Sequence, residues 1–105
     1  MNIQIQVAES VRQFIESHAK DVRARIIQTI DLLRDYGHEL RMPHSRMIMS
    51  GLYELRILGK ENIRIFYSFH KSSAFLFYAL TKKTQKLSKR DLHNAIRKQK
   101  ECELD

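Results

Sequence analysis

Four basic side chains in the second half of this 105-residue chain could together bind a phosphate group. Arg56 and Arg64 lie in two segments of alternating apolar residues, and Lys82 and Lys83 end a third. A guanidinium is a planar fork that donates parallel hydrogen bonds to phosphate oxygens, and a lysine ammonium adds a point charge. These residue types predict an anion site, provided that the fold brings the three segments together.

Cleavage of RNA by its own 2′-hydroxyl is a reaction that such a cluster could promote. The pentavalent phosphorane needs positive charge around it, the attacking oxygen needs a proton acceptor, and the leaving oxygen needs a proton donor. Lys82 or Lys83 could assist the proton transfer. Glu54, two residues before Arg56, could act as the base or could simply neutralise an arginine. The sequence leaves both roles of Glu54 open.

The net charge of the chain also favours a polyanionic partner. Lysine and arginine outnumber aspartate and glutamate by 19 to 12, which gives a formal charge of +7. The excess lies after residue 40, where fourteen basic residues accompany six acidic ones. Ordinary solvated surface charge would give the same count, so that alternative stays open. The RNA-binding positions that we expect are Arg46, Lys86, Lys89 and Arg90.

Several classes of site are missing from the sequence. Cys102 is the single cysteine, so the chain alone cannot build a disulfide or a cysteine zinc site. The five histidines lack HxxxH or HExxH spacing, and we expect neither a metal nor a cofactor. No apolar run approaches the roughly 18 residues that span a bilayer. We therefore expect a single domain over residues 1–105 that is cytoplasmic and enters no membrane.

The elements in the first half follow from hydrophobic periodicity. Apolar residues recur at helical spacing over residues 7–19 and 22–33, which predicts two helices packed as a hairpin. Gly37 is a typical signal for the end of the second helix. Residues 2–7 alternate polar and apolar side chains and could form a short strand.

The period changes to two after Pro43, which predicts an antiparallel meander. A basic helix should follow, because Ser88 and Asp91 have the spacing of a capping box. Phe66 and Tyr78 are expected to be buried beneath this helix rather than to stack on a base. The expected strands cover residues 52–58, 63–70 and 74–82, after a short apolar run at 47–49.

The strand register decides which charged side chains meet. Pairing Leu55 with Ile65 leaves a three-residue loop and sets Arg56 beside Arg64. Neighbouring like charges repel, so we expect an anion there. The same rule in the next hairpin pairs Tyr67 with Phe77, Phe69 with Phe75, and Arg64 with Leu80. The face expected to pack on the helical hairpin holds Tyr53, Leu55, Ile57, Ile65, Tyr67, Phe69, Phe75 and Phe77.

Three strings in this order resemble a known family. GLYELR at residues 51–56, RIFY at residues 64–67 and KKTQK at residues 82–86 look like the phage-derived, HigB-type branch of the RelE/ParE toxin superfamily. The resemblance covers residues 10–98, and the combination is more specific than any single string. It implies an α+β, RelE-like fold in which a helical hairpin packs on a twisted antiparallel sheet, with a C-terminal helix near the active face.

The resemblance also implies an activity and partners. Such proteins are toxins of type II toxin–antitoxin systems that cut mRNA in the ribosomal A site without a metal and leave a 2′,3′-cyclic phosphate. The implied partners are the ribosome with its mRNA and rRNA, and a cognate helix-turn-helix antitoxin of the HigA type. By position, Arg56, Arg64, Lys82 and Lys83 match basic residues of the family's site.

The sequence departs from the family pattern at both ends. Relatives often begin with a longer edge strand, which only residues 3–7 could supply here. Many ribosome-dependent relatives carry a catalytic Tyr or His near the C-terminus, whereas this chain offers only His93. Two other functions stay open: inhibition of gyrase, as in ParE-type relatives, and a non-catalytic module that binds nucleic acid for regulation.

Overall fold

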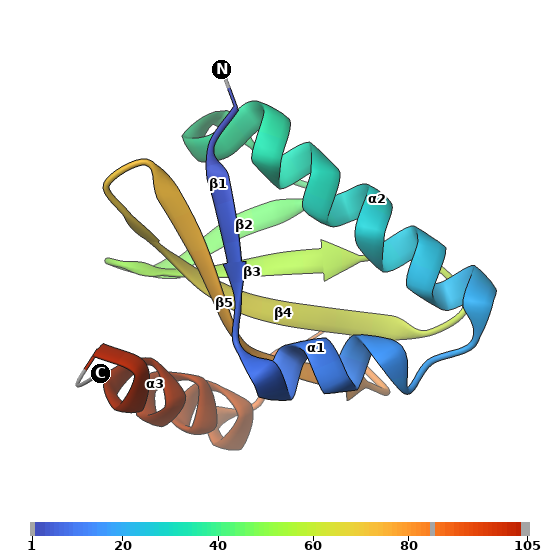
Figure 1. Cartoon of the computed structure of the whole chain (residues 1–105). Helices are drawn as coiled ribbons and strands as arrows, with labels where there is room; N and C mark the ends of the chain where they lie inside the picture. Colours follow the sequence, from blue (N-terminus) through green and yellow to red (C-terminus); the bar gives the residue numbers. More distant parts are fainter. Residues whose placement is uncertain (1, 85, 104–105) are drawn as a thin grey trace.

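A five-stranded sheet lies between two helical layers in the computed structural model, which describes residues 2–84 and 86–103. The strand order is β1-β5-β4-β3-β2. Helices α1 and α2 cover one face of the sheet and α3 covers the other (Figure 1). The elements are β1 (Gln4–Val7), α1 (Glu9–Glu16), α2 (Lys20–Tyr36), the 3-10 turn η1 (Gly37–Glu39), β2 (Ser45–Met49), β3 (Leu52–Ile57), β4 (Asn62–His70), β5 (Ser73–Lys82) and α3 (Lys89–Glu103).

The two predicted N-terminal helices are present as α1 and α2. Their apolar stripes meet the sheet, and Val11, Ile26 and Leu33 are buried there. Gly37 follows α2 with φ 54°, in the left-handed region that glycine tolerates better than other residues. A Cβ at Gly37 would also lie 3.3 Å from the Ile3 side chain. The predicted end of this helix is therefore confirmed.

Residues 4–7 form the edge strand β1, which pairs in parallel with β5. Gln4 is opposite Ser73, and Val7 is opposite Leu76. The three predicted strands form an antiparallel meander, as expected, and the apolar run at 47–49 belongs to a fourth antiparallel strand, β2. The segment at residues 4–7 adds one parallel edge strand. The chain runs from β1 into α1 and α2, which allows β1 to lie beside the last strand rather than the next one.

The predicted register of β3 and β4 is confirmed by the pairs Leu55 with Ile65 and Arg56 with Arg64. The register of β4 and β5 is as predicted only at one end, where Arg64 pairs with Leu80. Between Phe66 and Tyr67 it shifts by one residue, so that Phe66 faces Tyr78 while Tyr67 faces Leu76. This β-bulge leaves Phe77 as the extra residue.

The bulge corrects the predicted faces of β5. Because one inserted residue reverses the alternation beyond it, Phe75 and Phe77 lie on the α3 face, and Leu76 lies on the α1–α2 face. The predicted pairs of Tyr67 with Phe77 and of Phe69 with Phe75 are therefore wrong. The cluster beneath α3 contains Phe66 and Tyr78, as predicted, together with Leu52, Phe75, Phe77, Leu80, Leu92, Ala95 and Ile96.

Candidate functional site

The two arginines predicted to meet are direct neighbours across β3 and β4. Arg56 and Arg64 are Cα partners, and both project towards the α3 face of the sheet. Lys82 pairs with Asn62, two residues before Arg64 on β4, so the last lysine of β5 lies at the same end of the sheet. The structure brings these three residues together because β3, β4 and β5 are consecutive antiparallel strands.

Glu54 is the centre of this cluster. Its carboxylate is almost fully buried and lies 3.2 Å from Arg46 Nε, 3.4 Å from Arg64 Nε and 3.9 Å from Arg56 Nε. The strand register explains the arrangement, since Arg46 is opposite Glu54 on β2 and Arg56 follows Glu54 on the same side of β3. One carboxylate thus compensates part of the repulsion among three guanidiniums.

The three arginines differ in their access to solvent. The side chain of Arg46 is 43% exposed, that of Arg56 is 14% exposed and that of Arg64 is fully buried. Burial lowers the pKa of Arg64, while the charge of Glu54 opposes this shift. Arg64 Nη1 donates to the carbonyl of Ile63 at 3.2 Å. Arg46 and Arg56 therefore lie nearer to any ligand at this surface, and Arg64 adds its charge from below.

Lys82 is held in an ion pair that the sequence did not indicate. Its Nζ lies 2.5 Å from Asp91 Oδ2, and the lysine side chain is largely buried. Asp91 also completes the predicted capping box, because its amide donates to Ser88 Oγ at 3.0 Å and the Ser88 amide donates back to its carboxylate at 3.4 Å. The hydrogen bond from Lys82 is the main cause that lowers the pKa of Asp91. Lys82 thus fastens the start of α3 to β5.

The remaining predicted cations lie on the surface near the junction of β5 and α3. Lys83 follows directly after the end of β5, and its side chain is exposed, unlike that of Lys82. A mobile RNA backbone could reach these exposed groups without any rearrangement of the core. The exposed cations of this strip are Lys83, Lys86, Lys89 and Arg90.

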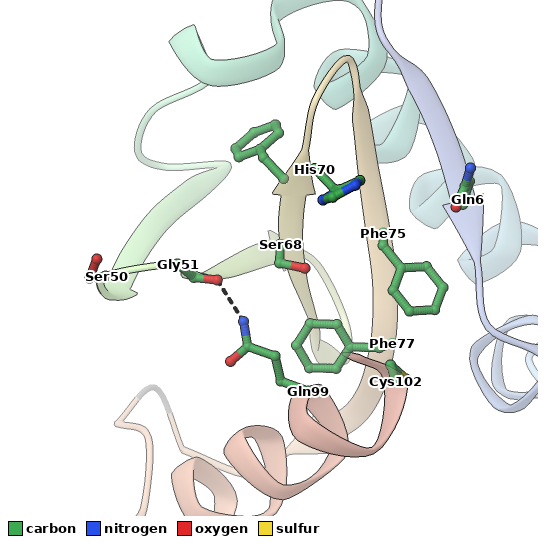
Figure 2. Close-up of a pocket in the computed structure, with 10 residues that line it drawn as sticks. Gln6, Ser50, Gly51, Ser68, His70, Phe75, Phe77, Gln99 and Cys102 are labelled. Atoms are coloured by element: carbon green, nitrogen blue, oxygen red, sulfur yellow. Dashed lines mark hydrogen bonds between the residues drawn. The ribbon is translucent and has the colours of Figure 1, made fainter. Parts of the chain in front are cut away.

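The structure also contains a cavity that sequence reasoning missed. It has a volume of about 670 Å³ and lies on the α3 face, where Phe75 and Phe77 form part of its wall (Figure 2). Gln99 closes one side by donating to the carbonyl of Gly51 at 2.7 Å. Ser68 and His70 of β4 also line it, so the cavity extends from about 13 Å to about 20 Å along the strand from Arg64. The β-bulge that turns the two phenyl rings towards α3 has no signal in the sequence.

No cluster of three His, Cys, Asp or Glu side chains that could hold a metal ion is found among residues 2–84 and 86–103. No helix in the same part of the chain combines the length and the apolar character needed to cross a membrane.

Comparison with known proteins places this chain in a family. A search of curated proteins finds no match by sequence. Among solved structures, the chain is similar to the E. coli toxin RelE, in a double arginine-to-alanine mutant in the free state, with a TM-score of 0.68 over 92% of this chain and 97% of that one. The sequence identity is 12%, so this likeness establishes the fold. The model of the phage-derived Gp49-like proteins matches residues 13–100, and the chain therefore belongs to that phage-derived family and has the RelE-like fold that its sequence predicted.

Proposed function

We propose that this protein is the toxin of a type II toxin–antitoxin system and that it cleaves mRNA on the ribosome. The observation that carries the proposal is the cluster of Arg46, Arg56 and Arg64 around one buried carboxylate at an end of a RelE-like sheet. Arginines gathered in this way leave a net positive surface, which suits a phosphodiester that gains negative charge in its transition state.

The proposed reaction is attack of a 2′-hydroxyl on the adjacent phosphorus. The 2′-hydroxyl gives up its proton to a solvent water, and its oxygen forms the new O–P bond that closes a 2′,3′-cyclic phosphate. The bond to the 5′-oxygen breaks, and that oxygen leaves as a hydroxyl after it gains a proton. Arg56, assisted by Arg46, would bind the nonbridging oxygens, and Arg64 would stabilise their charge from beneath. Lys83, which is exposed, or Lys82, once it is released from Asp91, would donate the proton to the leaving oxygen.

Glu54 has a different role in this proposal from that of a base. Its carboxylate is buried and faces three guanidiniums, so a substrate hydroxyl cannot reach it without displacing an arginine. We assign Glu54 the role of a positioning residue, because its carboxylate holds the three guanidinium groups close to one another. The sequence left two roles open for Glu54, and we propose that it neutralises arginine charge rather than acting as the base.

The partners in the proposal follow from the exposed strip. Lys86, Lys89 and Arg90 would bind rRNA in the cytoplasm, where ribosomes are found, and their exposed positions suit phosphate contacts. A helix-turn-helix antitoxin of the HigA type would neutralise the toxin.

Induction of the protein in cells, followed by mapping of mRNA 5′ ends, tests the function. New 5′ ends within translated reading frames and growth arrest are expected for the wild type. Arg56→Gln should lower cleavage about a hundredfold, because it removes a group that stabilises the transition state. Lys20→Gln, an exposed change at the start of α2, is the matched control and should cleave normally.

Two results would contradict the nuclease. A DNA-damage response with intact mRNA would indicate gyrase inhibition instead. Harmless expression together with salt-sensitive binding to duplex DNA would indicate a regulatory module.

A further inference from the structure

The outer edge of β2 presents backbone groups that no other strand uses. The carbonyl of His44 accepts the amide of Arg56 at 2.8 Å, so in this antiparallel pair Arg46 also hydrogen bonds with β3. The alternate residues, Ser45 and Met47, direct their amides and carbonyls away from β3. The Ser45 amide is satisfied by the carbonyl of Arg41 at 3.2 Å. Among residues 2–84 and 86–103, the backbone of Met47 makes no hydrogen bond other than those between neighbouring strands of the sheet.

Methionine side chains are exposed along the same edge. Met42, Met47 and Met49 are 53%, 59% and 45% exposed, respectively, which is unusual for large apolar residues on a short segment. An open edge strand is a template for a further strand, and proteins often protect such edges with lysine or proline. The sequence of β2 contains neither residue. Flexible methionines also adapt to the side chains of a partner.

A second cavity, of about 320 Å³, lies beside the start of β2. Its apolar wall consists of Leu32, Tyr36, Leu40 and Met42, and His44 links it directly to the strand. Tyr36 is itself exposed, which leaves the cavity open to solvent. The size and lining suit one apolar side chain of a segment that runs along β2.

The charges around this edge favour an acidic occupant. Arg41 and Arg46 are exposed at the two sides of Ser45. Arg46 is paired with the buried Glu54, but Glu54 is shared with Arg56 and Arg64, so it compensates only part of their charge. Glu39 lines the second cavity and is the acidic residue in its wall. The balance remains positive, so carboxylates of a partner would gain attraction here.

We propose that the edge of β2 is a docking site for an extended, acidic segment of a partner protein, which adds a sixth strand to the sheet and places an apolar side chain in the second cavity. Strand addition of this kind uses main-chain hydrogen bonds for affinity and side-chain pockets for specificity. RNA could meet the arginines but could not continue the backbone ladder or fill an apolar cavity. The proposal does not depend on nuclease activity.

Titration of the labelled full chain with short peptides tests the proposal by nuclear magnetic resonance. The probe is a capped peptide of alternating glutamate and valine, and its control replaces each glutamate with lysine. The glutamate peptide should shift the amide signal of Met47 in a saturable way and bind about tenfold more tightly than the lysine peptide. No shift at Met47, or equal binding of the two peptides, would overturn the proposal. A larger shift at Met47 with an oligouridylate than with the peptide would overturn it in favour of RNA.

Two variants make this result specific. Met47→Pro removes the outward amide but spares the ladder between Arg46 and Glu54, and it should weaken peptide binding about fivefold. Tyr36→Glu leaves β2 intact and places a negative charge at the second cavity, so it should weaken binding even if the proline variant folds poorly. Ile27→Ser, an exposed change elsewhere on α2, is the control and should bind as the wild type does. Unchanged binding in both test variants would contradict the assigned edge.

Discussion

Glu54 determines the balance of charge at the cationic end of the sheet. Removing its charge leaves Arg64 buried beside two other arginines without the carboxylate that compensates them. Glu54→Gln should therefore lower the free energy of unfolding by about 3–5 kcal/mol. Replacing both Glu54 and Arg64 with methionine should cost less than this single change, because no buried charge is then left alone. Urea denaturation of the two variants measures the difference, and an equal loss would contradict the compensating role.

The ion pair of Asp91 predicts a pH dependence. Lys82 lowers the pKa of Asp91 in the folded chain, so the pair stabilises the fold above the ordinary aspartate pKa of about 3.9. This contribution is lost as the pH falls through the lowered value, because protonation then removes the charge. A carbon-detected titration of Asp91 should show the low pKa in the wild type and a return towards the ordinary value in Lys82→Met. A pKa that is the same in both proteins would show that Lys82 is not the cause.

Tyr67 predicts an effect at the opposite end of the pH scale. Burial raises its pKa to about 12, although the hydrogen bond with Ser45 Oγ, at 2.5 Å, lowers it in part. The neutral phenol is favoured in the folded state, so its contribution to stability is complete below pH 10 and is lost as the pH rises towards 12. Ultraviolet titration should show a late phenolate transition that is missing in Tyr67→Phe. A transition that persists in this variant would assign the late signal to another tyrosine.

At the scale of elements, the bulge in β5 is the feature that could not be predicted from the sequence. Helices and strands were predictable because apolar residues recur with periods of 3.6 and 2. The register of β3 and β4 was predictable because only one pairing buries Leu55 and Ile65 together. In β5, however, residues 74–80 are apolar without interruption, so either face could be inward. The position of the bulge depends on how side chains pack beneath α3, and the alternation of residues along β5 does not reveal that packing.

The exchange of faces can be measured by comparing two phenylalanines. Phe77 is fully buried and Phe75 is half-buried, whereas the predicted register would have buried both against α1 and α2. Phe77→Ala should lower the free energy of unfolding by about 3–5 kcal/mol, and Phe75→Ala should cost less. Crosslinking of a cysteine at either position to α3 would confirm the face. Crosslinking to α1 instead would contradict the bulge.

At the scale of the whole molecule, the position of α3 on the sheet determines the surroundings of the charged site. The arginine neighbours in the site were predictable from register alone. The burial of Arg64 and the pairing of Lys82 with Asp91 were not, because both depend on where α3 lies on the sheet. An amphipathic pattern indicates which side of a helix is buried, but it does not give the position of that helix over its neighbours.

The exposed strip predicts a salt dependence of ribosome binding. If Lys86, Lys89 and Arg90 contact phosphates, each contact releases counterions, and binding should weaken steeply as salt rises. The triple glutamine variant should bind less tightly at low salt and show a shallower dependence on salt. Cosedimentation with ribosomes over a salt series measures both quantities. A variant with the wild-type slope would show that the strip does not touch rRNA.

The two attachments of α3 have a consequence for how the molecule opens. Lys82 with Asp91 secures one end of the helix, and Gln99 with Gly51 secures the other, while the phenyl rings of Phe66 and Phe77 lie between them. Because the two contacts are at different ends of α3, one end of the helix can detach from the sheet while the other end stays bound. Acid protonates Asp91 and breaks its ion pair with Lys82, but it leaves the hydrogen bond of Gln99 in place. The helix should therefore detach from the sheet first at its N-terminal end.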